Sequence, residues 1–383
     1  MEPREWVFPH DHGQHPDHRT EWWYFTGNLR EKATGRRFGY QFTIFRYGVV
    51  REPRQPASAW ALRDVWFAHF AVSDLESGRF YFSDLVERGS LGAAGASQRD
   101  MDVWIRDWRI EPLGAAPEED LGEVPTLTTA GESPLERAIA EALPIPTKLA
   151  VFGKEPGFRI VAEADGYGLE LELRPGKPRV FHGPDGTGLS QKSNQKGNAS
   201  HYYSYTRLLA DGTVRVGEER LAVEGTSWFD HEFSTSALAD NQDGWDWFSL
   251  QLDDETELMV YGIRRSDGSV DPASKGSFVQ KDGEKIHLRR EDFSITPLDE
   301  WKSPKTGATY PSGWEVEVPR LDLALTVTPM MRDQELVLEG LIPVSYWEGA
   351  CKIDGTRDGE AVTGHGYVEL SGYDEALGPG MRQ

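Results

Sequence analysis

The sequence E-W-W-Y-F-T-G-N-L at residues 21–29 has a fainter copy, G-W-D-W-F-S-L-Q-L, at residues 244–252. Aligned, the two stretches share the pattern W-x-[YW]-F-[TS]-x-[NQ]-L. An Asp-His pair stands ten to fourteen residues ahead of each copy, at 11–12 and at 230–231. Three aromatic residues and an amide at matching offsets indicate an internal duplication, and a chain of 383 residues is long enough for two similar domains.

The rest of the chain repeats the signals of β-strands. Between residues 169 and 174, three leucines alternate with charged residues, which is the period of a strand with one wet face. Strands are expected at 22–29, 38–47, 64–74, 79–86, 102–110, 158–164, 169–174, 201–209, 215–224, 245–252, 257–265, 277–280, 285–295, 314–319, 321–328, 335–341 and 360–373. Many short strands joined by tight turns predict an all-β protein built from sandwiches or barrels.

One short helix is expected within an insertion at residues 114–156, which is rich in Ala, Pro and acidic residues. Ser133 can cap this helix, Pro134 suits its first turn, and Pro144 ends it. The insertion is therefore predicted to be one helix between strands of an otherwise all-β fold.

The composition narrows the class of protein. A formal charge of -22 at pH 7 disfavours nucleic acid as a partner, because phosphate binding needs clustered Lys and Arg. The single cysteine, Cys351, excludes an intrachain disulfide and a zinc site built on cysteines. Residues 1–6 have no apolar leader, and no apolar run approaches a membrane span, so a soluble chain without a transmembrane segment is expected.

Four of the ten histidines lie in the first 20 residues, among prolines and aspartates: His10, His12, His15 and His18. Imidazoles and carboxylates at short spacing can gather around zinc or iron. An extended Pro-rich segment whose histidines bind backbone groups or line a cavity mouth is the preferred interpretation. We therefore predict no metal and no organic cofactor.

The candidate catalytic residues are Asp230, His231, Glu232 and Glu21. Two carboxylates beside an imidazole can tune its pKa and orient its tautomer, although alternation in a strand would place His231 on the face opposite its two neighbours. A structural role for His231 therefore stays open. Glu21 and Glu348 stand beside tryptophans: burial would raise their pKa values, whereas hydrogen bonds from an indole or an arginine would keep them ionised.

The repeated stretches also supply aromatic residues at alternate positions, which share one face of a strand. Two interpretations are open: these rings pack in the floor of a barrel, or they line a cavity for an elongated apolar ligand. Several tyrosines elsewhere could hydrogen-bond a polar end of that ligand. The candidate ligand-contacting residues are Trp22, Tyr24, Tyr203, Trp245, Trp247, Tyr261, Tyr346 and Tyr367.

Six motifs occur in order along the chain: F-P-x-D-H-G-x-H at 8–15, E-W-W-Y-F-T-G-N-L at 21–29, W-F-D-H-E-F at 228–233, G-W-D-W-F-S-L-Q-L at 244–252, Y-W-E-G at 346–349 and G-H-G-Y-V-E-L-S-G-Y at 364–373. With these motifs the chain resembles the lipocalin-like family that contains AttH proteins and bacterial carotenoid 1,2-hydratases. The resemblance implies two tandem lipocalin-like antiparallel β-barrels, the first over residues 1–224 and the second over 225–383.

The resemblance also implies an isoprenoid- or lipid-like ligand, and either hydration of a double bond or, as in fungal relatives, cyclisation. It implies an acidic residue on the strand that follows D-H-E, but that strand reads M-V-Y-G-I-R at 259–264, with no carboxylate beside Tyr261. Phe233 also replaces the usual tryptophan after D-H-E. Because no G-x-S-x-G elbow or H-E-x-x-H helix is present, hydrolysis is not expected.

Two hypotheses therefore stand. In the first, the protein is a hydratase or cyclase that protonates an alkene in an aromatic-lined cavity without a cofactor. In the second, the same cavity serves a lipophilic carrier or chaperone. The resemblance implies association with an ABC transporter and an exported or envelope location for such a carrier.

Overall fold

The computed structural model of the chain describes residues 1–49, 62–114, 156–195, 197–235, 238–338 and 344–374. These residues form strands and three short 3₁₀ turns, η1 (His10–His12), η2 (Arg290–Asp292) and η3 (Pro319–Leu321). None of their helices is long and apolar enough to cross a membrane. The helix predicted around Ser133 lies outside the described residues.

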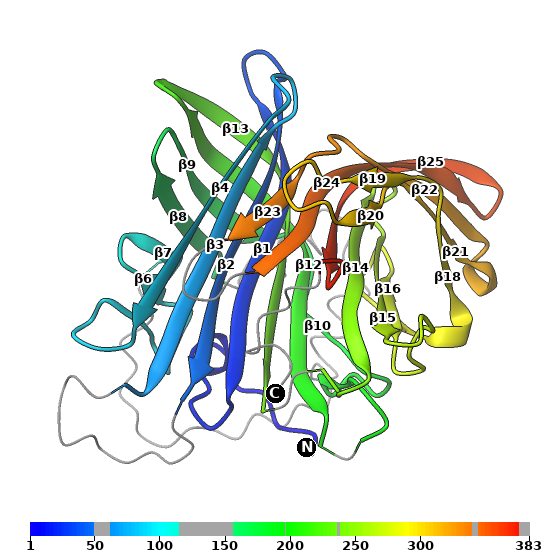
Figure 1. Cartoon of the computed structure of the whole chain (residues 1–383), viewed down its shortest axis with the longest axis horizontal. Helices are drawn as coiled ribbons and strands as arrows, with labels where there is room; N and C mark the ends of the chain where they lie inside the picture. Colours follow the sequence, from blue (N-terminus) through cyan, green and yellow to red (C-terminus); the bar gives the residue numbers. More distant parts are fainter. Residues whose placement is uncertain (50–61, 115–155, 196, 236–237, 339–343, 375–383) are drawn as a thin grey trace, which may run out of the picture.

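The first sheet has 13 strands in the order β4-β3-β2-β1-β13-β12-β9-β8-β7-β6-β5, with β10 and β11 also paired to β12. Its two ends, β4 and β5, are consecutive in the chain, so the antiparallel meander curls into a nearly closed barrel (Figure 1). The strands are β1 (Thr20–Glu31), β2 (Arg37–Gly48), β3 (Asp64–Asp74), β4 (Arg79–Arg88), β5 (Ala94–Ala96), β6 (Val103–Ile105), β7 (Trp108–Pro112), β8 (Phe158–Ala164), β9 (Tyr167–Pro175), β10 (Val180–Phe181), β11 (Leu189–Gln191), β12 (Ala199–Val216) and β13 (Glu219–Ser234).

The second sheet has ten strands in the order β17-β16-β15-β14-β25-β24-β22-β21-β18, with β23 also paired to β24, and it lies beside the first (Figure 1). A separate two-stranded sheet joins β19 to β20. The strands are β14 (Gln242–Leu252), β15 (Glu257–Arg265), β16 (Lys275–Val279), β17 (Lys285–Arg289), β18 (Ser294–Pro297), β19 (Glu300–Lys302), β20 (Thr309–Pro311), β21 (Trp314–Val318), β22 (Leu323–Pro329), β23 (Glu335–Leu338), β24 (Val344–Arg357) and β25 (Glu360–Ser371).

The two sheets have the same topology. In each, the first four strands run in sequence to one edge, and the last strand returns to pair with the first: β13 with β1, and β25 with β14. The repeated aromatic stretches are these first strands, β1 and β14, as the duplication predicts. The Asp-His pairs ahead of them are not equivalent, because Asp11-His12 lies in η1 whereas Asp230-His231 lies within β13.

The predicted division between residues 224 and 225 falls inside β13, which runs to Ser234 without a break. The next strand, β14, begins the second sheet at Gln242. The D-H-E motif therefore belongs to the first sheet. The assignment of two domains with these bounds stays a proposal.

Each barrel has its own apolar core. The first is dominated by aromatic side chains with no exposure, among them Trp23, Phe25, Phe42 and Phe229. The second contains Phe248, Val260, Trp314 and Leu370 together with the cysteine, Cys351, all at most 2% exposed. Truncating one such aromatic residue to alanine typically costs about 3–5 kcal/mol, so these cores can hold the two barrels without a disulfide.

Most predicted strands are present, but two predictions are wrong. The strands expected at 201–209 and 215–224 leave a break at 210–214, yet β12 continues through Gly212 to Val216, and the turn is at Gly217 with φ of 62°. Gly212 allows β12 to lie close to β9, because a Cβ at this position would lie 2.1 Å from the carbonyl oxygen of Glu170. The strand β24 was not predicted at all, and it is one of the longest of the second sheet.

Candidate functional site

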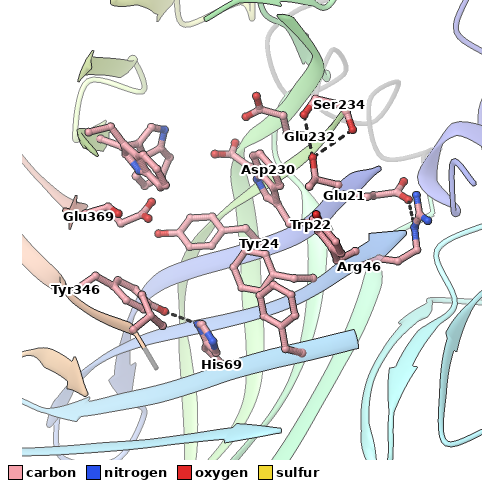
Figure 2. A pocket seen from close by; sticks show the side chains of 18 of the residues that line it. Glu21, Trp22, Tyr24, Arg46, His69, Asp230, Glu232, Ser234, Tyr346 and Glu369 are labelled. Carbon is pink, nitrogen blue, oxygen red and sulfur yellow. Dashed lines mark hydrogen bonds and ion pairs between the residues drawn. The ribbon is translucent and has the colours of Figure 1, made fainter. Parts of the chain in front are cut away.

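A cavity of about 490 Å³ lies between the two barrels rather than inside either of them (Figure 2). Its wall is built by β1–β4, β12 and β13 of the first sheet and by β14, β15, β24 and β25 of the second. The lining residues that carry rings or ionisable groups are Glu21, Trp22, Tyr24, Phe45, Arg46, Tyr47, Phe67, His69, Asp84, Lys192, Tyr202, Asp230, Glu232, Trp245, Trp247, Tyr261, Tyr346, Glu348 and Glu369.

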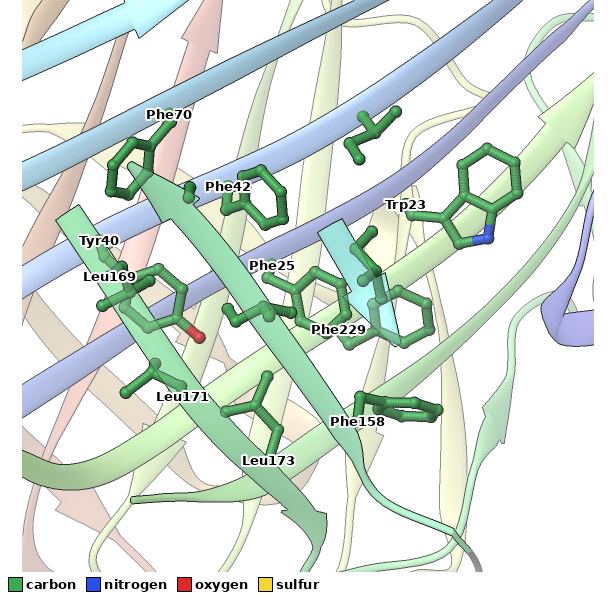
Figure 3. Packing of buried hydrophobic residues seen from close by; sticks show 14 of the residues in the cluster. Trp23, Phe25, Tyr40, Phe42, Phe70, Phe158, Leu169, Leu171, Leu173 and Phe229 are labelled. Carbon is green, nitrogen blue, oxygen red and sulfur yellow. The ribbon is translucent and has the colours of Figure 1, made fainter. Parts of the chain in front are cut away.

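The period of β1 explains how this strand supplies both a core and a cavity. Trp23 and Phe25 point into the first barrel, where they pack beside Phe229 (Figure 3). Trp22 and Tyr24 alternate with them and therefore point outward, into the cavity. The same alternation on β14 sends Trp247 to the cavity and Phe248 to the second core.

The two repeated stretches meet in this cavity. The ring of Tyr24 lies 5.4 Å from that of Trp247, at an interplanar angle of 86°, which is a favourable edge-to-face contact. Six of the eight predicted ligand-contacting residues line the cavity: Trp22, Tyr24, Trp245, Trp247, Tyr261 and Tyr346. The expectation that these rings form the floor of a barrel is therefore wrong, and the alternative of a lined cavity describes them.

Two predicted ligand-contacting residues lie elsewhere. Tyr203 points into the first barrel, where its hydroxyl lies 2.6 Å from Nδ1 of His12. Tyr367 is 1% exposed and lines only a very small void between the barrels, together with Thr26 and Asn28.

Asp230 faces the cavity from β13 and is held by three donors. The indole N–H of Trp228 donates to Oδ1 at 2.6 Å, the hydroxyl of Tyr202 donates to Oδ2 at 2.7 Å, and the hydroxyl of Ser204 donates to Oδ1. Burial nevertheless raises the pKa of Asp230 to about 7, against the hydrogen bonds that lower it. This carboxyl group therefore titrates near neutral pH.

A second set of carboxyl groups faces the cavity from the other barrel. One row of paired residues crosses four strands: Tyr261 of β15, Trp247 of β14, Glu369 of β25 and Glu348 of β24. Burial raises the pKa of Glu369 to about 7, and it raises the pKa of Glu348 well above its ordinary value with help from the charge of Glu369. Two carboxyl groups directly opposite each other resist joint ionisation, so this pair retains a proton.

The donors around these two glutamates differ from those around Asp230. The hydroxyl of Tyr24 donates to Oε1 of Glu348, and Oε2 of Glu348 has no hydrogen-bond partner among the described residues. Glu369 is only half-buried, and the indole of Trp245 is a hydrogen-bonding partner that lowers its pKa. Glu369 is therefore more accessible than the buried Glu348 and Asp230.

No carboxylate lies beside Tyr261 on β15. Glu369 of β25 lies two strands away from Tyr261 in the same cross-strand row. Glu369 was not predicted as a site residue, although it lies in the motif G-H-G-Y-V-E-L-S-G-Y at 364–373. A lone carboxylate between Val368 and Leu370 was the signal in the sequence.

Lys192 is the basic residue that reaches into the cavity from the segment after β11. Its Nζ lies 2.7 Å from Oε1 of Glu232. The same Nζ lies 5.1 Å from the ring centroid of Tyr202 and 4.8 Å from that of Tyr261. Glu232, a predicted catalytic residue, is therefore paired with a fixed cation, and its charge helps to raise the pKa values of Asp230 and Glu369 in the same cavity.

His231 lies on the opposite face of β13, inside the first barrel, and does not line the cavity. Its Nε2 is 3.0 Å from Oε1 of Glu21, and its Nδ1 is 3.1 Å from the hydroxyl of Tyr203. Burial lowers the pKa of His231, so the ring is neutral at pH 7. His231 therefore does not face the cavity, because alternation along β13 separates it from Asp230, and its catalytic role stays a prediction.

Glu21 lies at the edge of the cavity and binds the N-terminal segment to the barrel. Its carboxylate accepts a hydrogen bond from Nδ1 of His15 at 2.7 Å. It accepts a second from Nε of Arg46 at 3.1 Å (Figure 2). Burial opposes ionisation, but the hydrogen bonds and charges of His15 and His231 lower the pKa of Glu21 well below its ordinary range. The raised pKa that would make Glu21 a general acid is not found.

The histidine-rich segment gathers around Glu21. One ligand atom each of His15, Glu21 and His231 lies within 4.8 Å of the others, a spacing that a metal ion could bridge. Hydrogen bonds among these groups and the guanidinium of Arg46 already account for the spacing. The carboxylate of Asp11 accepts from Nε2 of His15 at 3.1 Å, and these acidic partners raise the pKa of His15 against its burial.

His69 was not predicted, and it lines the cavity from β3. Its Nδ1 lies 2.7 Å from the hydroxyl of Tyr346, so it joins the two barrels. Burial lowers the pKa of His69 to about 3, and the ring is therefore neutral.

Two tandem lipocalin-like barrels with a cavity at their interface define the class of this protein. The profile of the AttH-like family matches residues 1–130 and 148–373, and the chain belongs to this family. A crystal structure assigned to AttH, from Nitrosomonas europaea, is 30% identical, covers 97% of this chain and 100% of its own, and has a TM-score of 0.76.

More distant structures share the fold. Kievitone hydratase from Nectria haematococca is 15% identical, with a TM-score of 0.63 and coverage of 96% of this chain and 93% of its own. CghA, solved with Sch210972, is 11% identical, with a TM-score of 0.50 and coverage of 94% and 89%. A comparison with curated proteins returns no match.

Proposed function

We propose that the protein binds an unsaturated isoprenoid- or lipid-like molecule between its barrels and adds water to a double bond. The observation that supports this most is that two carboxyl groups with pKa values of about 7, Asp230 and Glu369, face one aromatic cavity from different barrels. Groups that titrate near the working pH are suited to general acid and base catalysis. Kievitone hydratase has the same fold, so the fold is compatible with a hydration.

The surroundings of the two carboxyl groups support a different proposed role for each. Burial, with the charges of Asp230 and Glu232, favours the protonated form of Glu369, so Glu369 is the general acid. Three donors, Trp228, Tyr202 and Ser204, favour the ionised form of Asp230, so Asp230 is the general base. Tyr24 and Trp247 supply aromatic surface for the apolar ligand.

The proposed reaction has two steps. Glu369 gives its proton to one alkene carbon, which forms a C–H bond and leaves a cation on the other carbon. The oxygen of a water molecule then bonds to that cation while Asp230 takes a proton from the water. The net result is the addition of one water, after which solvent returns the proton from Asp230 to Glu369. Capture of the cation by a second double bond would give a cyclisation from the same first step.

The test is to incubate the protein with a total lipid extract in water enriched in oxygen-18. We expect a lipid whose mass rises by one labelled water. Because loss of a general acid or base typically costs 10²–10⁴-fold in rate, Glu369→Gln and Asp230→Asn should each reduce the product at least about a hundredfold. Glu360→Gln, the same change at an exposed position of β25, should leave it unchanged.

Native mass spectrometry of the same mixture separates the alternatives. A bound lipid of unchanged mass, without labelled product, would contradict hydration and support the carrier hypothesis. The absence of any bound lipid and of any product would contradict both.

A further inference from the structure

Acidic side chains outnumber basic side chains in the lining of the cavity. Among the described residues, six carboxyl groups line it but only two permanently basic side chains, Arg46 and Lys192. Arg46 is already paired with Glu21 at 3.1 Å and with Asp64 at 2.8 Å. Lys192 is paired with Glu232 at 2.7 Å. Both basic side chains are therefore already in ion pairs with carboxylates of the protein.

Four carboxyl groups remain without a basic partner within ion-pair distance in the described part of the chain: Asp84, Asp230, Glu348 and Glu369. His69 does not compensate them, because its ring is neutral and bonded to Tyr346. Burying several carboxyl groups without counter-charges is costly, and proteins rarely keep such a group unless a ligand uses it.

The aromatic wall of the same cavity accepts an ammonium group. The Nζ of Lys192 lies over the faces of Tyr202 and Tyr261, at 5.1 and 4.8 Å from their centroids. Trp22 and Trp245 add larger faces to the same wall. Ring faces combined with carboxylates are the chemistry that recognises organic cations, and indole faces bind them best.

We infer that the cavity is built for a ligand that carries or develops positive charge, and that a hydrophobic ammonium ion is its favoured ligand class. This inference rests on the proposed function and deepens it, since the cation formed on alkene protonation would be stabilised by the same carboxylates and rings. An ammonium ligand would mimic that cation.

Proton release accompanies the binding of a cation in this arrangement. The carboxyl groups of Asp230 and Glu369 hold protons below pH 7, and a bound cation would favour their ionised forms. The other titratable or charged groups that face them are Tyr24 of β1, His69 of β3, Asp84 of β4, Lys192, Tyr202 of β12, Glu232 of β13, Tyr261 of β15, and Tyr346 and Glu348 of β24. Of these, Lys192 is the one fixed cation near the pair.

The test compares three probes with the same alkyl chain: octyltrimethylammonium, octan-1-ol and octanoate. Isothermal titration calorimetry at pH 6 and pH 8, in two buffers of different ionisation enthalpy, gives affinity and proton release together. At pH 8 we expect the ammonium ion to bind at least about tenfold more tightly than octan-1-ol, which corresponds to a desolvated cation–π contact. Its affinity should fall several-fold at pH 6, and its binding should release protons near pH 7.

A matched pair of variants locates the effect. Glu369→Gln should reduce the preference for the ammonium ion while octan-1-ol binds as before, and Glu360→Gln should behave as the wild type. Equal binding of the ammonium ion and octan-1-ol, or tighter binding of octanoate, would overturn this inference and leave the proposed function standing. Failure of all three probes to bind would count against both.

Discussion

A carboxyl group that is buried among other carboxyl groups keeps its proton to a higher pH, and this cavity contains three such groups. Asp230, Glu348 and Glu369 have raised pKa values for two physical reasons, burial and mutual repulsion. Glu21 shows the opposite result of burial, because Arg46 and two histidines surround it. All four side chains carry a carboxyl group, so the difference in their pKa values comes from their partners.

The raised pKa of Asp230 makes a prediction about stability. Its pKa rises from 3.8 in the unfolded chain to about 7 in the folded one, so the folded state binds more protons between those values. Stability contributed by this group is therefore present below about pH 4 and lost as the pH rises through 7. The loss is on the order of 4 kcal/mol, since the shift is about three pKa units and one unit corresponds to about 1.4 kcal/mol.

We therefore expect Asp230→Asn to be more stable relative to the wild type at pH 8 than at pH 4.5. Urea denaturation at the two pH values measures the difference between the two free energies of unfolding. Asp240→Asn, at an exposed position, provides the control and should show no such change. An equal difference at both pH values would contradict the raised pKa.

At the scale of elements, the repeated strands decide the architecture. β1 and β14 each bury both faces, one in a barrel and one against the other barrel. The sequence predicted their equivalence and most of the strands around them. It could not predict which face lines a cavity, because Trp22 and Tyr24 are as aromatic as Trp23 and Phe25, and alternation alone does not distinguish inside from outside.

The sequence also did not predict the strand β24. Its sequence from 344 to 357 contains two glycines and several charged residues, which resemble turn chemistry more than a strand. Gly349 and Gly355 instead permit close neighbours: a Cβ would lie 2.1 Å from Gln334 in the first case and 2.2 Å from the carbonyl oxygen of Ala324 in the second. Such contacts between distant parts of the chain carry no local signal. Glu348, on this strand, could not be placed in the cavity for the same reason.

Close packing between the barrels makes a second prediction at this scale. A Cβ on Gly39 of β2 would lie 2.6 Å from Cβ of Ala350 of β24. Gly39→Ala should therefore lower the free energy of unfolding by about 1–3 kcal/mol, as overpacking does. Ala350→Gly in the same chain should restore part of the loss, because it removes the opposing atom.

The matched control is Gly262→Ala, where the nearest atom to a new Cβ is 3.8 Å away. Urea denaturation of the three variants measures the effect. A neutral Gly39→Ala variant, or no rescue by Ala350→Gly, would show that the barrels are not in contact at this point.

At the scale of the whole molecule, the duplication creates a site that neither copy holds alone. Each barrel fills its interior with side chains, and the two outer faces enclose the cavity between them. The base and the acid of the proposed reaction come from different barrels, Asp230 from the first and Glu369 from the second. The tandem arrangement is thus a requirement of the site, and the sequence could predict the two barrels but not their shared cavity.

The central claim is that the ligand binds between the barrels, and filling that space tests it directly. Ile263 lines the cavity from β15 and is 2% exposed, whereas Val270 is 41% exposed at the surface. Isothermal titration calorimetry with octan-1-ol should show that Ile263→Trp loses at least about tenfold in affinity, while Val270→Trp binds as the wild type does. Undiminished binding by a folded Ile263→Trp variant would contradict the account.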